Sequence, residues 1–141
     1  AAKDYVFDID RFISFEGNTG PYILYTIVRI KSILGKYEAQ NPGTKAETIL
    51  PAASDAEKTL MLELSKYNDV MENAFAETAP HKICQYIFDL SNAFNSFYHD
   101  TRILAEEDKA RQASWIALIT LVKRVLEACI QVLGFEAPER M

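Results

Sequence analysis

The chain has 141 residues, of which 49% are hydrophobic, and a formal net charge of −5. This length suits one domain with a core of its own. The negative charge excludes a protein that binds nucleic acids over its whole surface, because such proteins are usually basic; a small local site remains compatible with it. The sequence shows no signal peptide and no apolar run of membrane-spanning length, so a cytoplasmic protein without a membrane partner is expected.

The first predicted helix runs from about Pro21 to Tyr37. Asn18 or Thr19 can cap its N-terminus, and proline suits the first helical position, where its missing N–H costs nothing. Four apolar residues recur at steps of four, three and four, which places them on one helix face: Ile23, Ile27, Ile30 and Leu34. Gly35 is expected to weaken the end of this helix.

A turn-rich loop at residues 38–51 precedes the second predicted helix, which opens at Ser54 and fades near Thr78. The serine can accept a hydrogen bond from a free backbone N–H while Glu57 reaches back, which is the pattern of a capping box. Larger side chains then repeat at helical spacing: Leu60, Leu64, Tyr67 and Met71.

A third helix is predicted to begin at Pro80 and to end near residues 98–100. Its apolar residues form the most regular heptad-like stripe in the chain: Ile83, Ile87, Leu90, Phe94 and Phe97. The acidic run Glu106–Asp108 suits the positive end of a fourth helix, which is predicted to reach Leu133 before Gly134 and Pro138 stop it. With no strand pair in the pattern, the fold class predicted is all-α, a bundle of four or more helices.

Several groups suggest chemistry, but each has a simpler structural interpretation. His81 and Cys84 lie three residues apart, yet a metal site needs two further ligands, and no third group orients a nucleophile. Cys84 and Cys129 are expected to be buried free thiols. Residues 17–20, Gly-Asn-Thr-Gly, suit a turn before the first helix and are also compatible with a backbone cradle for phosphate.

Tyr22, Tyr25 and Arg29 share one face of the first helix, by steps of three and four. Tyrosine rings stack on bases, and an arginine plane can stack or bind phosphate. The same spacing also fits amphipathic core tyrosines beside an arginine that extends to solvent. The pattern alone favours the structural interpretation and leaves both open.

Residues 14–29, Ser-Phe-Glu-Gly-Asn-Thr-Gly-Pro-Tyr-x-x-Tyr-x-x-x-Arg, are similar to a segment that follows the catalytic domain of arginyl-tRNA synthetases. Other stretches resemble the third helix and the C-terminus of the same domain: Pro80-His81, Tyr86, Asp89-Leu90, residues 94–98 and residues 133–141. Over most of its length the chain therefore resembles the C-terminal anticodon-binding, DALR-type domain of arginyl-tRNA synthetase. Family members often have Gln and His inside the first segment, where this chain has Leu24 and Ile27.

The resemblance implies an all-α anticodon-binding bundle. Its partners would be the anticodon loop of arginine tRNA and the parent protein's own catalytic domain, with no role for DNA. That domain, an arginine-tRNA ligase, would use ATP with Mg to activate arginine, whereas no cofactor, metal or catalytic residue is expected in this chain. The resemblance also implies five anticodon-binding residues: Tyr22, Tyr25, Arg29, Tyr98 and Met141. Residues 1–17 would connect to the missing catalytic domain, and residues 18–141 would form the binding domain.

Two alternatives remain open at this point. A helical protein–protein interaction module without an RNA role would pack Tyr22, Tyr25 and Met141 inward or against a partner helix. A related anticodon domain, such as that of a glycyl-tRNA synthetase β-subunit, would share the fold, but the Pro-Glu-Arg-Met ending speaks against it.

Overall fold

The computed structural model of the protein describes residues 19–134. Within this range the chain forms five α-helices and one 3-10 turn: α2 (Thr19–Gln40), α3 (Asp55–Ser65), α4 (Tyr67–Glu77), α5 (Pro80–Asp100), η1 (Ile103–Ala105) and α6 (Lys109–Val132). The same range contains no strand, which confirms the predicted all-α bundle. None of these helices is both long enough and apolar enough to cross a bilayer.

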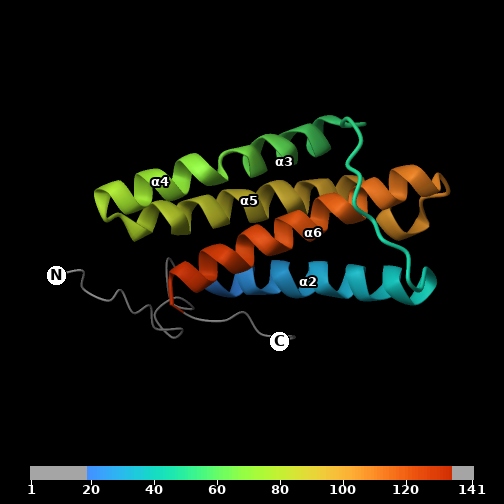
Figure 1. The fold of residues 1–141 in the computed structure, drawn as a ribbon, viewed down its shortest axis with the longest axis horizontal. Coiled ribbons are helices and arrows are strands. Elements are labelled where there is room, and N and C mark those ends of the chain that lie inside the picture. The colour runs from blue at the N-terminus through green and yellow to red at the C-terminus, as the bar shows by residue number, and fades with distance from the viewer. Residues whose placement is uncertain (1–18, 135–141) are drawn as a thin grey trace.

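Helix α5 lies at the centre of the bundle (Figure 1). It packs against α2, α3, α4 and α6, and α6 also packs along α2. The largest fully buried side chains come from all four of the predicted helices: Ile23, Ile27, Ile30, Leu60, Ile87, Leu90, Phe94, Phe97, Leu118, Ile119 and Leu126. Each such side chain contributes roughly 1.5–3 kcal/mol through its removal from water.

Helix α2 is longer than predicted at both ends. It already includes Thr19, while the other proposed cap, Asn18, lies outside the described residues. The helix continues past Gly35, because Tyr37 is only 6% exposed and its burial outweighs a glycine cost of about 1 kcal/mol. The chain leaves the helix after Gln40, where the Asn41 side chain donates a hydrogen bond to the Tyr37 carbonyl at 3.0 Å.

The second predicted helix is in fact two helices, α3 and α4, which are separated at Lys66. The Tyr86 hydroxyl on α5 donates a hydrogen bond to the Glu63 carbonyl at 2.8 Å, and the Lys66 N–H bonds the same carbonyl at 3.2 Å. A side chain that enters the backbone ladder is a recognised cause of a helix break. The sequence pattern of this segment could not show it, because Tyr86 lies on another helix.

The start of α3 follows the predicted capping box with one shift. The Ser54 hydroxyl accepts a hydrogen bond from the Glu57 N–H at 3.1 Å, as expected. The Glu57 carboxylate, however, reaches the N–H of Ala53 at 2.8 Å, one residue before the serine. The serine cap is therefore confirmed, and the reciprocal half of the box is displaced by one residue.

The remaining ends agree with the sequence. Pro80 lies in the first turn of α5, and Asp108 caps α6 by accepting hydrogen bonds from two backbone N–H groups. Gly134 has φ +100°, which suits the residue after a helix, whereas Pro138 lies outside the described residues. The turn η1 was not predicted; it is held where the buried Gln112 side chain donates to the Ile103 carbonyl at 3.0 Å. Cys84 and Cys129 are both buried, as predicted.

Candidate nucleic-acid interface

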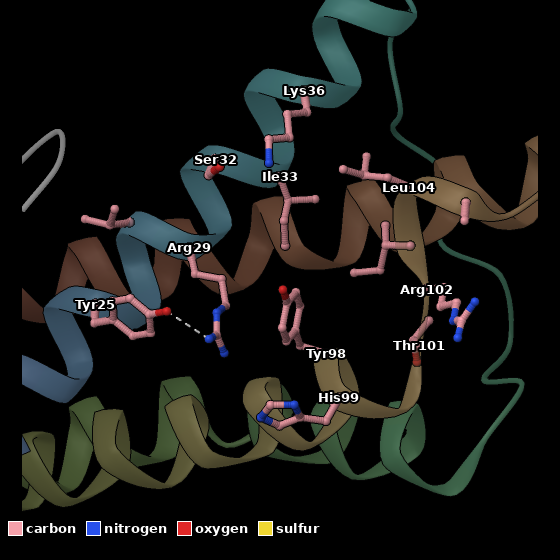
Figure 2. Close-up of a pocket in the computed structure, with 13 residues that line it drawn as sticks. Tyr25, Arg29, Ser32, Ile33, Lys36, Tyr98, His99, Thr101, Arg102 and Leu104 are labelled. Carbon is pink, nitrogen blue, oxygen red and sulfur yellow. Dashed lines mark hydrogen bonds between the residues drawn. The ribbon is translucent and has the colours of Figure 1, made fainter.

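Three of the predicted site residues meet where the middle of α2 faces the end of α5. Figure 2 shows the Arg29 side chain between the rings of Tyr25 and Tyr98. The guanidinium carbon lies 4.8 Å from the Tyr25 ring centroid and 4.3 Å from the Tyr98 ring centroid. Both distances are within the range of a cation–π interaction. The helical spacing of Tyr25 and Arg29 and the position of Tyr98 at the end of α5 therefore produce one stacked cluster.

Asn95 on α5 holds this cluster in place. Its side-chain oxygen accepts a hydrogen bond from Arg29 Nη1 at 2.7 Å. Its nitrogen lies within hydrogen-bond distance of the Tyr22 hydroxyl, at 3.1 Å, and of the Thr26 hydroxyl, at 3.0 Å. Asn95 is only 8% exposed, and buried amides are normally hydrogen-bonded in this way. Asn95 was not among the predicted site residues. A signal was present in the sequence, because Asn95 directly follows Phe94 of the apolar stripe, and a polar side chain at such a position needs a hydrogen-bond partner.

Tyr22 and Tyr25 have different environments. The Tyr22 hydroxyl donates to the Asn92 side chain at 2.7 Å, and its ring lies 5.9 Å from that of Phe88, so the residue is partly buried. Tyr25 is 51% exposed, although its hydroxyl accepts a hydrogen bond from Arg29 Nη2 at 3.0 Å. Tyr25 is thus the ring that offers an open face to a ligand, whereas Tyr22 forms part of the wall.

Two adjoining hollows surround the cluster. The larger, of about 690 Å³, extends from Tyr25 along α2 to η1, and the smaller, of about 460 Å³, lies between α2 and α5 and includes Tyr22 and Asn95. Tyr25, Arg29 and His99 line both of them. Among the described residues that line the two hollows there is no aspartate or glutamate, which makes the hollows a suitable place for an anionic or π-stacking ligand.

Comparisons with known proteins decide the family. Residues 23–141 match the family model described as the DALR anticodon binding domain. The chain belongs to this family.

The relatives of this DALR domain are arginine–tRNA ligases. The domain is 62% identical over 143 residues to the arginine–tRNA ligase of Agathobacter rectalis. The alignment covers 100% of this chain and 24% of that ligase. The domain is 56% identical over 139 residues to the arginine–tRNA ligase of Alkaliphilus oremlandii, in an alignment that covers 99% of this chain and 24% of that ligase. The solved arginyl-tRNA synthetase of Thermus thermophilus has a TM-score of 0.75 at 32% identity and covers 92% of this chain and 22% of that protein. The DALR domain thus spans about a quarter of the length of these relatives, 24% for the first.

The interaction-module alternative predicted that the α2 tyrosines pack inward or against a partner helix. In the DALR domain Tyr25 is half exposed and shares a hollow with Tyr22, which counts against that alternative. Leu24 and Ile27 are 3% and 0% exposed and belong to the core, so they do not reach the site. The fifth predicted residue, Met141, lies outside the described residues.

Metal binding finds no support in the described part of the DALR domain. Between residues 19 and 134, no three His, Cys, Asp or Glu side chains converge in a way that could hold an ion. His81 is exposed while Cys84 is buried, so the two residues three apart on α5 occupy different environments.

Proposed function

We propose that this domain binds the anticodon loop of arginine tRNA and so positions the tRNA for aminoacylation. The ATP- and Mg-dependent reaction takes place in a catalytic domain elsewhere in the parent protein, an arginine-tRNA ligase that is also this domain's intramolecular partner. The observation that carries the proposal is the Arg29 guanidinium held between Tyr25 and Tyr98 in a family of anticodon-binding domains. Four described residues make the site, and Met141 is the fifth: Tyr22, Tyr25, Arg29 and Tyr98.

The geometry supports base stacking as the main source of affinity. Anticodon bases can leave their stack and lie against aromatic faces, and Tyr25 presents such a face to solvent. A base stacked on an aromatic side chain is worth roughly 1–3 kcal/mol. Two of the five N–H groups of Arg29 are used within the protein, so the others can donate to a base edge or a phosphate.

The domain limits form part of the proposal. We assign residues 18–141 to the anticodon-binding domain and residues 1–17 to a connector from the catalytic domain. The family match over residues 23–141 and the start of α2 at or before Thr19 support this boundary.

Binding to RNA stem-loops tests the function directly. The chain is titrated at low salt with the anticodon stem-loop of an arginine tRNA and with the same stem-loop carrying changed anticodon bases, with fluorescence anisotropy as the readout. We expect tighter binding to the arginine anticodon. Tyr25→Ala should weaken it about five- to 150-fold, because one stack is lost.

The matched control for this variant is Phe75→Ala. Phe75 on α4 is also an exposed aromatic residue, at 66%, but it lines neither hollow. Its loss should leave binding unchanged. Equal affinity for both stem-loops, or an equal effect of the two substitutions, would argue against the proposed function.

A further inference from the structure

The larger hollow continues beyond the stacked cluster along the same face of α2. The positions 22, 25 and 29 are followed at steps of three and four by Ser32 and Lys36, which also line it. Lys36 is seven residues after Arg29, which places it two turns and about 10 Å further along the helix axis. Figure 2 shows Lys36 on this wall and Thr101 and Arg102, which follow α5, on the opposite wall.

This extension is positively charged in a chain that is negative as a whole. Its lining within residues 19–134 includes Arg29, Lys36 and Arg102 but no carboxylate. Neither Lys36 nor Arg102 has a carboxylate within salt-bridge distance among residues 19–134, even though Asp100 and Glu106 lie near Arg102 in the chain.

Some lysines elsewhere in the domain are neutralised by nearby acids, although others, such as Lys58, are not paired with an acid in the part of the chain that the structure describes. Lys66 pairs with Glu63, and Lys82 pairs with Glu77. Lys36 and Arg102 differ from these two paired lysines because, within residues 19–134, no acid partner competes with an external anion. An unneutralised pair of cations beside a base-stacking site matches the alternation of bases and phosphates in a single-stranded nucleic acid.

We propose that the part of the hollow between Lys36 and Arg102 binds the sugar-phosphate backbone of the RNA whose bases lie against Tyr25 and Arg29. The inference rests on the proposed function and adds to it the residues that bind the phosphates of the same anticodon loop. Ser32 and Thr101 in the lining supply hydroxyl groups that can donate to phosphate oxygens. The backbone contacts fix the position of the loop, while the stacked cluster distinguishes its bases.

Salt dependence separates these two roles. The logarithm of the binding constant for a single strand falls with the logarithm of the salt concentration by roughly 0.7 for each neutralised phosphate. The double variant Lys36→Gln/Arg102→Gln should therefore reduce this slope by about 1.4, and it should leave the ratio of affinities for the arginine and changed anticodons unaltered.

The matched control is the double variant Lys58→Gln/Arg124→Gln. It also removes one lysine and one arginine that are exposed and lack an acid partner among the described residues, but neither lines a hollow. It corrects for the change in net charge and should leave the slope close to that of the original chain. Circular dichroism establishes that both double variants remain helical.

The outcomes distinguish this inference from the function on which it rests. If the anticodon preference is present and the salt-dependence slope is the same in the two double variants, the phosphate site is overturned and the proposed function is kept. A reduced slope without anticodon preference would keep the phosphate site and overturn the base-reading function. Absence of binding to either stem-loop would overturn both for this chain.

Discussion

The Asn95 side chain on α5 accepts a hydrogen bond from the Arg29 guanidinium on α2 at 2.7 Å. This contact joins residues far apart in the sequence and determines where the arginine plane lies between its two tyrosines. Asn95 itself lines only the smaller hollow and is nearly buried. It therefore positions the arginine, and its effect on binding is transmitted through Arg29.

Asn95→Ala should weaken both RNA binding and the fold. The substitution leaves Arg29 and the Tyr22 and Thr26 hydroxyls without this partner, so the unfolding free energy should fall by about 1–3 kcal/mol. Anticodon stem-loop affinity should fall about tenfold at a temperature where the variant is fully folded. Urea denaturation and fluorescence anisotropy measure the two effects.

Asn73→Ala on α4 is the control for that substitution, because Asn73 is exposed and lines neither hollow. An Asn95→Ala variant that is destabilised but binds RNA with unchanged affinity would limit Asn95 to a role in stability.

Arg29→Lys tests whether the planar guanidinium matters or only its charge. Lysine keeps the charge but cannot stack as a plane between Tyr25 and Tyr98 or donate in two directions to Asn95 and Tyr25. We expect affinity for the arginine anticodon to fall about tenfold while the salt dependence stays nearly unchanged. Arg124→Lys, at an exposed position of α6, should have no effect, and similar affinities for the two variants would refute the stacking role.

Glu57→Ala should destabilise the bundle without changing the site. Glu57 is 0% exposed, accepts a hydrogen bond from the Ala53 N–H at 2.8 Å and accepts another from the Trp115 indole at 3.3 Å. Loss of the carboxylate leaves both donors without this acceptor, which should cost about 2 kcal/mol in urea denaturation. Lys58→Ala at the next position is exposed and should change stability by less than about 0.5 kcal/mol. Equal stability of the two variants would contradict this account.

The thiol of Cys129 should make the fold sensitive to alkali. Burial, followed by the nearby Cys84, raises the pKa of Cys129 from its ordinary value of 9.0 to about 12. The unfolded chain therefore releases this proton first, and the stabilising contribution is complete below pH 9 and is lost as the pH rises towards 12. Burial also raises the pKa of Tyr86, which adds to the loss in the same direction.

Two measurements check this prediction. The unfolding free energy is followed between pH 8 and about pH 11, and Cys129→Ala should show a smaller decrease because the titrating thiol is absent. At pH 8 the native thiol should react slowly with a thiol reagent and rapidly only in urea. Rapid reaction of Cys129 in the native protein would show that the thiol is neither buried nor protonated.

The sequence predicted the parts of the molecule that depend on local periodicity. The apolar stripes predicted part of the core, and the steps from Tyr22 to Arg29 predicted a shared helix face. The break at Lys66 depends on a hydroxyl from another helix, and the end of α2 depends on the burial of Tyr37, so neither could be read from one segment.

The candidate site divides in the same way. The family resemblance supplied Tyr98 as one of the site residues, and the structure places its ring against the Arg29 guanidinium. Asn95 and the pair Lys36 and Arg102 were not predicted, because their importance comes from which helices lie side by side and from which cations lack an acid partner. Such properties depend on tertiary packing.

The stacked cluster links two helices that also share the core, and this has a thermodynamic consequence. A ligand that lies against the cluster of Tyr25 and Arg29 on α2 and Tyr98 on α5 binds only when both helices are in place. By mass action, RNA at a hundred times its dissociation constant would add about 2.7 kcal/mol to the free energy of unfolding. The bound anticodon loop would thus stabilise the packing of α2 against α5. The melting temperature of the domain would then rise most with the RNA that binds most tightly.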